Sequence, residues 1–398
     1  MGRCRDIRII GRCSGTGLTL TEFSLRVAIV HHWLVTWRGG ERVLAEICRL
    51  FPGAPIHTLF GSPQLMPEPI ASHPGRTSFL DAGRRFREWL LPLYPLGVRS
   101  LDLRDYDLVI SSDASVAKGV RTRPDAIHLC YCHAPARYAW DFPEEYVRAQ
   151  IPAPLRPLAY AGLAWIRHYD RRAASRVDAF ATNSEAVASR IDRHYGREAA
   201  VVPPPVDLER FAPDPATSRE EFYLCAGQLV PYKCADLAVE ACRRTGRRLV
   251  VVGEGPLESR LRAMAGDGIE FRGACPDAEL RDLYQRCRAL IFPGEEDFGI
   301  VPLEAMACGA PVVALGRGGA LETVIGSRAG EPPPLGATGL FFDEPSVPSL
   351  CAALDAFESG EQPDPAATRR RALEFSPQVF RQAFAAWVNT HTPGAITN

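Results

Sequence analysis

The chain has 398 residues, of which 46% are hydrophobic and 23% are charged, and its formal net charge is −1. This composition is typical of a globular protein, and the length exceeds what one ordinary core holds, so we expect two domains. Because the chain has no overall positive charge, we do not expect nucleic acid as its partner.

The first 24 residues carry early arginines but no continuous apolar core of signal-peptide length, so residues 1–24 are interpreted as an N-terminal extension without assigned structure. No run approaches the ~18 apolar residues that a membrane span needs. The twelve cysteines form no CxxC pair, and the closest two are Cys130 and Cys132. We therefore expect reduced, mostly buried thiols of a cytoplasmic protein, in preference to a disulfide or metal framework.

The first half of the chain alternates β-rich apolar runs with helical patterns, which is typical of parallel sheets covered by helices. LRVAIVHHW and GGERVLAEICRLF predict a strand, a glycine turn and a helix in succession. Further strand candidates are APIHTLF, YDLVISS, AIHLCYC, VDAFATNS and AAVVPPP. The proline-rich, charged tract that follows breaks the pattern as a linker would. We therefore expect the first domain to span residues 25–215.

The second half, 216–375, restarts the alternation without a visible repeat. Its strand candidates are EFYLCAGQL, RRLVVVGEG, IEFRG, RALIFPG, APVVAL and TGLFFD, with helices expected from Ala235, Leu257, Asp277 and Ile300. The prediction is two doubly wound α/β sheets facing across a cleft, with ligands beyond the carboxyl ends of the strands. The segment TRRRALEFSPQVFRQAFAAWVNT is predicted to be a helix, and the C-terminal part, 376–398, can cross back to the first domain.

The stretch GEEDFGIVPLEAMACG follows a strand and runs into a helix. Acids such as Glu295, Glu296 and Asp297 are favoured at a helix start, so a capping role explains one or two of them. Glu304 lies inside the helix among apolar residues, and it either faces water or has a dedicated donor, such as two sugar hydroxyls. The free N–H groups at Phe298, Gly299 and Ile300 suit a phosphate.

The spacing Glu296-x7-Glu304, with the glycines after it, resembles the retaining nucleotide-sugar glycosyltransferases of family four, which have the GT-B fold. It is most similar to bacterial GDP-mannose-dependent mannosyltransferases of polysaccharide biosynthesis, and the resemblance runs from about Leu25 to about Asp343. It implies that Glu296 contacts the donor sugar and Glu304 the ribose. The backbone of Phe298, Gly299 and Ile300 then meets the diphosphate.

Lysine occurs only at Lys118 and Lys233. Lys233, expected to open a helix, can act as a point charge on a diphosphate, although an exposed surface cation is the ordinary interpretation of a lysine. By resemblance, Lys233 joins the catalytic set. The family usually has an arginine where Gln228 stands, and Gln228 donates a hydrogen bond without bringing charge.

Four glycines are further candidates for the nucleotide-sugar site. Gly39 and Gly40 form a strand-to-helix turn whose amides can meet the diphosphate or the acceptor, with a plain turn as the alternative. Gly253 and Gly255 end a strand, where a turn alone also explains them. By resemblance, Arg272 and Gly273 border the base.

His133 directly follows a strand, where an imidazole can donate to the donor sugar or to the departing phosphate oxygen, although a structurally satisfied histidine is the alternative. The resemblance favours function, so the catalytic candidates are His133, Glu296 and Lys233. Asn183 or Ser184 is interpreted as a helix N-cap. The sequence DYD at 105–107 is interpreted as the polar start of a strand, and no metal or other cofactor is expected.

The resemblance implies transfer of a hexose, mannose from GDP-mannose, to a lipid-linked or oligosaccharide acceptor with retention at the anomeric carbon. Residues 84–101 mix arginines with Trp89 and Tyr94, as a surface-seeking segment at the inner face of the cytoplasmic membrane would, and a packed helix plus loop is the alternative. A sugar-nucleotide epimerase of the same fold and an inactive nucleotide-sugar-binding subunit remain open as alternatives.

Overall fold

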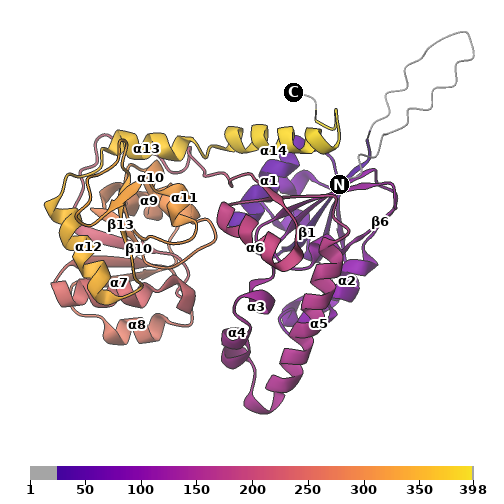
Figure 1. Cartoon of the computed structure of the whole chain (residues 1–398), viewed down its shortest axis with the longest axis horizontal. Coiled ribbons are helices and arrows are strands. Elements are labelled where there is room, and N and C mark those ends of the chain that lie inside the picture. Colours follow the sequence, from indigo (N-terminus) through magenta and orange to yellow (C-terminus); the bar gives the residue numbers. More distant parts are fainter. Residues whose placement is uncertain (1–24, 397–398) are drawn as a thin grey trace, which may run out of the picture.

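Each half of the chain forms a seven-stranded sheet whose strands all pair in parallel (Figure 1). The computed structural model of the protein describes residues 25–396, and the N-terminal extension at 1–24 lies outside them. Strands such as β5 and β13 are buried along their whole length, because helices cover both faces of each sheet. This burial on both faces explains why the strands appear in the sequence as continuous apolar runs.

The first sheet has the strand order β3-β2-β1-β5-β7-β8-β9. Its strands are β1 (Val27–Leu34), β2 (Ile56–Gly61), β3 (Gly75–Thr77), β5 (Leu108–Asp113), β7 (Ile127–Cys132), β8 (Ala179–Thr182) and β9 (Ala199–Val201). A separate two-stranded sheet pairs β4 (Asp102–Leu103) with β6 (Arg121–Thr122). The helices of this half are α1 (Gly39–Leu50), α2 (Tyr94–Ser100), α3 (Arg137–Trp140), α4 (Pro143–Gln150), α5 (Arg156–Ala174) and α6 (Glu185–Tyr195).

The second sheet has the order β12-β11-β10-β13-β14-β16-β15. Its strands are β10 (Phe222–Ala226), β11 (Arg248–Val252), β12 (Ile269–Gly273), β13 (Ala289–Phe292), β14 (Val312–Leu315), β15 (Gly326–Arg328) and β16 (Gly339–Phe342). The helices that cover it are α7 (Ala235–Thr245), α8 (Glu258–Met264), α9 (Asp277–Arg286), α10 (Ile300–Ala307), α11 (Ala320–Thr323), α12 (Val347–Ser359) and α13 (Pro365–Leu373). The sequence did not single out β15 or α12.

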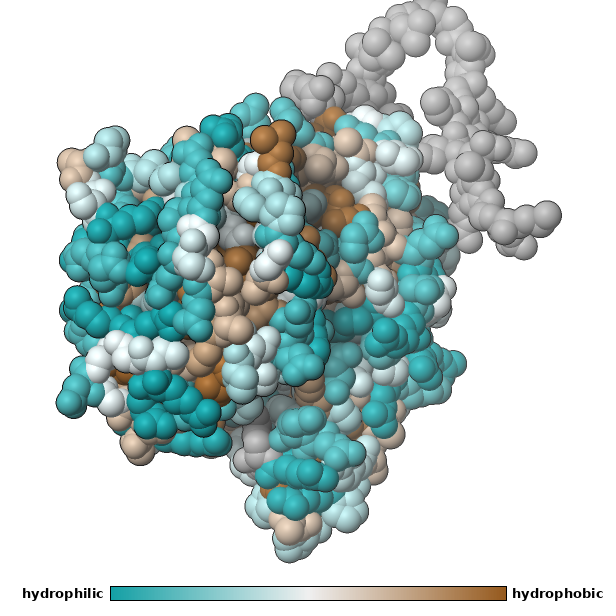
Figure 2. Space-filling view, turned by 60° about the vertical axis from the view of Figure 1, so that its left-hand side comes forward, coloured by the Kyte–Doolittle hydropathy of each residue, from teal (hydrophilic) through white to brown (hydrophobic). Residues whose placement is uncertain are grey.

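The side chains of β1 alternate between two cores, which is the signature of a doubly covered sheet. Ile29 packs with Leu44 of α1, whereas Ala28 and Val30 pack on the opposite face with Leu59. The apolar residues are concentrated in such cores, and the outer face seen in Figure 2 is mainly hydrophilic with smaller apolar areas. Within the described part of the chain, no helix combines the length and apolar character that crossing a bilayer requires.

The chain crosses between the two halves twice. The first crossing follows β9, and the second joins α13 to α14 (Pro377–His391), which runs from one half to the other in Figure 1. The two crossing segments are hydrogen-bonded, since Val206 N donates to Phe375 O at 2.9 Å. On the first half, Phe380 and Phe384 of α14 pack in the same core as Tyr131 of β7.

The prediction of one continuous helix over the last segment was wrong. The helix breaks between Leu373 and Pro377, because a proline has no N–H to donate to a preceding turn. Ser376 caps the new helix by accepting from Val379 N at 3.2 Å. The break lets the chain leave the second half and dock on the first.

All ten cysteines within the described residues are free thiols, and seven of them are buried. Burial raises the pKa of the Cys48 and Cys225 thiols to about 12. These groups therefore act as small apolar core residues.

Candidate functional site

Both sheets reverse their strand order beside their first strand, and the candidate site lies between these two places. In the first sheet the reversal lies between β1 and β5, and in the second between β10 and β13. Ligands of open α/β sheets bind at such switch points, beyond the carboxyl ends of the strands. A cavity of about 760 Å³ opens there, and residues of both halves line it.

The first half contributes a glycine turn and a histidine to this cavity. Gly39 and Gly40 begin α1 directly after β1, and His133 follows β7. His133 is half-buried, and its Nε2 lies 2.8 Å from Ser112 Oγ. Burial in this corner lowers the pKa of His133 to about 4, so its ring is neutral at neutral pH.

Asn183, after β8, also lines the cavity, and its side-chain amide donates to His133 O at 2.9 Å. The neighbouring Ser184 is the N-cap of α6, as predicted, because its hydroxyl accepts from Val187 N at 3.2 Å.

The second half contributes Gln228 after β10 and the segment from Glu296 to Ile300 after β13. Gly299 has φ of 85°, a left-handed conformation that favours glycine, and it is the N-cap of α10. No side chain caps α10, so its first N–H groups stay open to an anion that enters the cavity.

The expectation that the acids before α10 cap it was wrong, because no side chain caps this helix and two of the three acids have cationic partners elsewhere. Glu296 Oε1 lies 2.8 Å from Lys233 Nζ. Asp297 accepts from Arg137 at 3.5 Å and from Arg190, both in the first half. These pairs turn the two carboxylates away from the helix axis and towards the cleft.

Lys233 does not open a helix as expected. It ends a 3-10 turn (Pro231–Lys233), and Cys234 follows with φ of 51° before α7 begins. Such a conformation is uncommon for a residue other than glycine, asparagine or aspartate and costs free energy. The turn presents the Lys233 ammonium group to Glu296 at the edge of the cleft.

Glu304 is buried inside α10 with an exposed fraction of 5%, so the alternative of a solvent-facing carboxylate was wrong. Its dedicated donors are Arg42 Nη1 at 2.6 Å and, more weakly, Tyr284 OH at 3.5 Å. Burial raises the pKa of the Glu304 carboxyl above its ordinary value, and Arg42 opposes this shift only in part. Glu304 does not line the 760 Å³ cavity.

Further polar contacts join the two halves around the cleft. Arg38 Nη1 donates to Gln228 Oε1 at 3.4 Å. The Glu322 carboxylate accepts from Glu185 N at 2.8 Å and from Ala186 N at 3.1 Å, at the start of α6. The cleft is therefore bridged by the Arg38 side chain before α1 and by the Glu322 side chain of α11, which accepts from backbone N–H groups of α6.

Besides Lys233 and Glu304, four more predicted site residues do not line the cavity. Gly253 has φ of 129°, and a Cβ there would come within 1.9 Å of Gly227 O, so this glycine lets two loops pack closely. Gly255 packs in the same way against Leu229. Arg272 pairs with Glu270 at 2.6 Å, and neither Arg272 nor Gly273 lines the cavity. Their contact with a base stays a prediction.

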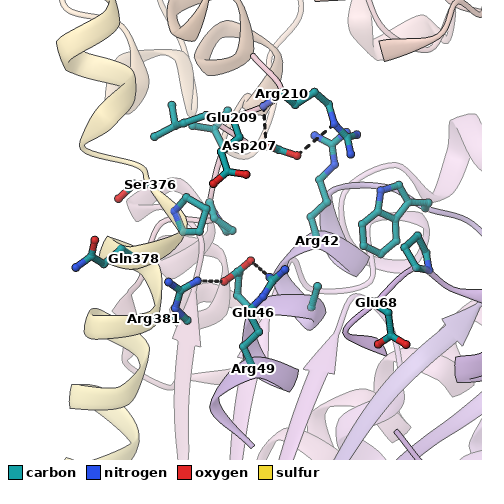
Figure 3. A pocket seen from close by; sticks show the side chains of 17 residues that line it. Arg42, Glu46, Arg49, Glu68, Asp207, Glu209, Arg210, Ser376, Gln378 and Arg381 are labelled. Atoms are coloured by element: carbon teal, nitrogen blue, oxygen red, sulfur yellow. Dashed lines mark hydrogen bonds and ion pairs between the residues drawn. The ribbon is translucent and has the colours of Figure 1, made fainter. Parts of the chain in front are cut away.

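A second cavity, of about 600 Å³, is lined by residues of α1, of the first crossing segment and of the start of α14 (Figure 3). Four arginines line it together with four acids, and the dashed lines in Figure 3 join Glu46 to Arg49 and Arg381. The larger cavity, in contrast, lies beyond the carboxyl ends of the strands and contains the start of α10, so we assign the chemistry to it.

Several residues of the site were missed from the sequence: Arg38, Arg42, Arg137, Arg190, Tyr284 and Glu322. Arg38 and Arg42 flank the glycine pair at a spacing of one helical turn, which was the one available signal. Among the described residues, no group of three or more His, Cys, Asp or Glu side chains is arranged to hold a metal ion. Independence from metal stays a prediction.

Two family models match the chain in adjoining regions. A model described as Glycosyltransferase Family 4 matches residues 37–210, and one described as Glycosyl transferases group 1 matches residues 208–375. The two matches meet in the segment that first crosses between the halves.

Curated relatives match the chain over part of its length. A GDP-mannose-dependent alpha-(1-6)-phosphatidylinositol monomannoside mannosyltransferase of Mycolicibacterium smegmatis is 35% identical over 190 residues, which are 40% of this chain and 50% of the relative. A D-inositol 3-phosphate glycosyltransferase of Streptomyces bingchenggensis is 36% identical over 175 residues, 36% of this chain and 38% of the relative. The chain thus spans half or less of these relatives.

The fold also matches solved structures. HepE of Anabaena, in complex with UDP and glucose, superposes with a TM-score of 0.63 over 92% of this chain and 100% of that chain. The sequence identity in that comparison is 15%, so the likeness concerns the arrangement of the two sheets.

Proposed function

The chain belongs to the family-four glycosyltransferases with the GT-B fold, and from this premise we propose that it transfers a hexose from a nucleotide sugar with retention at the anomeric carbon. The observation that carries the proposal is the meeting of three anion-binding features in one cleft. These are the uncapped start of α10, the ammonium group of Lys233 and the glycine turn that begins α1.

The donor diphosphate fits between the two helix starts. The N–H groups of Gly299 and Ile300 approach it from the second domain, and those of Gly39 and Gly40 from the first. Lys233, now paired with Glu296, supplies positive charge to the departing phosphate. Gln228 brings no charge, but Arg38 reaches over it from the first domain at 3.4 Å.

Glu296 lines the cavity and suits a contact with the donor sugar. Glu304 suits the ribose hydroxyls once Arg42 releases it, because an ionised carboxylate accepts two hydrogen bonds from a vicinal diol. The reaction would proceed on one face of the sugar through an oxocarbenium-like ion pair, with the departing phosphate taking the acceptor's proton. Catalysis would then depend on positioning and charge stabilisation.

Mannose from GDP-mannose is the donor that we favour. The support is the GDP-mannose-dependent activity of the Mycolicibacterium smegmatis relative, and the inositol-phosphate relative leaves other hexoses as competitors. No metal is assigned to the reaction, since the helix starts and Lys233 can neutralise the phosphates themselves.

A lipid-linked acceptor at a membrane surface is the second part of the proposal. Arg87, Leu91 and Tyr94 line the cavity, while the adjacent Phe86 and Trp89 are exposed by 60% and 69%. The 3-10 segment at residues 91–93 packs against α5, which exposes Leu158 and Trp165. An apolar surface beside the acceptor side of the cleft, carrying Arg84 and Arg85, suits an anionic bilayer.

Ligand-induced stabilisation tests the donor site directly. Thermal unfolding and calorimetry with GDP, UDP, ADP, GDP-mannose and UDP-glucose, with and without EDTA, should show selective, EDTA-insensitive stabilisation by GDP compounds. A ligand at 100 times its Kd stabilises the folded state by about 2.7 kcal/mol. Binding of GDP-mannose without turnover on any lipid-linked or soluble sugar acceptor would favour an inactive binding subunit, and absence of nucleotide binding would overturn the proposal.

Flotation with anionic vesicles tests the membrane contact. Trp89→Ser combined with Leu158→Ser should reduce the bound fraction severalfold. Leu335→Ser is the matched control, because Leu335 is fully exposed but belongs to the second domain. Equal flotation of all three proteins would contradict a bilayer contact at this surface.

A further inference from the structure

A buried network of four polar side chains connects Glu41 of α1 to His133 at the cavity. Glu41 Oε1 lies 3.6 Å from His31 Nε2, His31 Nδ1 lies 3.1 Å from Ser112 Oγ, and Ser112 Oγ lies 2.8 Å from His133 Nε2. His31 and Ser112 are directly paired in the register of β1 and β5. The sheet therefore fixes the positions of His31 and Ser112 in the middle of this buried network.

Glu41, at the end of the buried network away from the cavity, carries a well-defined charge. The Glu41 carboxylate is buried, and it accepts from the backbone N–H of Arg38 at 2.8 Å. Burial opposes ionisation of Glu41, but its contact with His31, the neighbouring His32 and this backbone hydrogen bond prevail and lower its pKa to about 2. Glu41 is thus an anion at neutral pH.

Proton counting then sets the direction of each hydrogen bond. A neutral His31 beside an anion keeps its proton on Nε2, because a lone pair facing a carboxylate is repelled. His31 Nδ1 is then an acceptor, and it takes the single hydroxyl proton of Ser112. Ser112 Oγ can only accept from its other neighbour, so His133 carries its proton on Nε2.

The remaining nitrogen of His133 is the one available to a ligand. His133 lines the cavity, and within residues 25–396 its Nδ1 has no hydrogen-bond partner. With the proton held on Nε2 by Ser112, Nδ1 presents a lone pair. A sugar hydroxyl, which can donate, matches this nitrogen, whereas an unprotonated phosphate oxygen does not.

We propose that Glu41, His31 and Ser112 are positioning residues that hold His133 in the Nε2–H tautomer, so that its Nδ1 accepts a hydrogen bond from a hydroxyl of the bound sugar. The role differs from the donation to a phosphate or sugar that the sequence suggested. The inference rests on the proposed function for the identity of the ligand. The tautomer of His133 itself depends only on the buried network of Glu41, His31 and Ser112.

The tautomer is measured by NMR on the full chain labelled with ¹⁵N at histidine. The spectrum is recorded at pH 8, above the ordinary pKa of imidazole near 6.5. Two-bond proton–nitrogen correlations distinguish a protonated from a bare ring nitrogen, and His133→Gln identifies the signals of His133. We expect a protonated Nε2 and a bare Nδ1, and the opposite assignment would overturn the proposal.

Two serine variants separate positioning from general packing. Ser112→Ala should release the tautomer of His133 into a mixture and lower kcat about tenfold with little change in KM for the donor. Ser111→Ala is the matched control, because Ser111 is equally buried on the same strand but contacts His128, at 2.9 Å. An unchanged His133 spectrum in Ser112→Ala would refute the role of Ser112.

A donor analogue series identifies the partner of Nδ1. Wild-type enzyme should lose about tenfold in kcat/KM with the one deoxy-sugar nucleotide that lacks the contacting hydroxyl, and Ser112→Ala should lose much less on the same change. If no nucleotide sugar binds at all, the proposed function fails while the tautomer result stands. If the donor binds and every deoxy analogue behaves alike in both proteins, the proposed contact is absent.

Discussion

Arg42 of α1 and Glu304 of α10 form an ion pair with 2.6 Å between Nη1 and Oε1, and this pair joins the two domains across the cleft. Glu304 is also the carboxylate to which the family resemblance gives the ribose. A ribose diol and the Arg42 guanidinium compete for the same oxygen atoms. Nucleotide binding should therefore exchange an interdomain ion pair for a ligand contact.

Substitution of either partner should have opposite effects on nucleotide affinity. Arg42→Gln removes the competitor, so GDP should bind about fivefold more tightly, while the free energy of unfolding falls by about 3 kcal/mol because a buried carboxylate loses its cation. Glu304→Gln should weaken GDP binding about tenfold. Calorimetric titration and chemical denaturation measure the two effects.

Arg49→Gln is the matched control for Arg42→Gln. Arg49 lies on the same helix and pairs with Glu46 without touching the second domain, so GDP affinity should be unchanged. Complete loss of GDP binding in Arg42→Gln would instead make Arg42 part of the nucleotide site.

The two lysines of the chain should have separate phenotypes. Lys118 is fully buried, with its Nζ 2.8 Å from Asp113 and 2.5 Å from Asp170. Lys118→Met leaves two buried carboxylates without their cation and should cost about 3–5 kcal/mol of stability. Lys233→Met, at the edge of the cleft, should leave the melting temperature within a few degrees while nucleotide-diphosphate binding falls at least tenfold.

Reductive methylation gives an independent measurement of the same difference. Lys233 should react in the free protein and be protected by GDP, whereas Lys118 should react only after unfolding. Protection of neither lysine by a nucleotide that binds would place the diphosphate away from Lys233.

The positions of most strands could be predicted because both sheets are buried on two faces and leave continuous apolar runs. The edge strand β15 has three residues, none of them buried, so it left no such pattern. The helical break before Pro377 carried a usable Ser-Pro signal that the helical periodicity outweighed.

The site residues that directly follow a strand could also be predicted from the sequence. The contacts between residues far apart in the sequence could not. Gly39, His133 and Glu296 each follow a strand, so their place at the cleft follows from the fold. The partners of Glu304 and Asp297 lie 262 and 160 residues away, and no local pattern encodes which arginine each will meet. Those pairings depend on how the two domains pack.

Arg38 should contribute to affinity for the diphosphate in particular. Its guanidinium reaches the neutral Gln228, and among the described residues it has no acidic partner, so its charge is available to a ligand. Arg38→Gln should weaken GDP binding about tenfold and guanosine binding hardly at all. Arg87→Gln, a cavity arginine beside Glu88, should affect GDP binding less than threefold. Equal losses for GDP and guanosine in Arg38→Gln would assign it to the nucleoside.

Buried histidines should make the fold sensitive to mild acid. Burial is the main cause that lowers the pKa of His32 to about 3 and of His57 and His128 to about 4. The unfolded chain binds these protons near pH 6.5, and the folded chain does not until about pH 4. The unfolded state therefore binds more protons in this window, and stability must fall as the pH drops through it.

Each such histidine changes the free energy of unfolding by up to about 1.4 kcal/mol per pH unit between these two pKa values. Denaturant titrations from pH 7.5 to 5 should show a loss of several kcal/mol, with little change above pH 7.5. His57→Gln removes one titrating group at a position whose Nε2 has no hydrogen-bond partner, so it should reduce the slope by about one histidine's share. A flat profile in the wild type would mean that these imidazoles are protonated in the folded state, for instance because water reaches them.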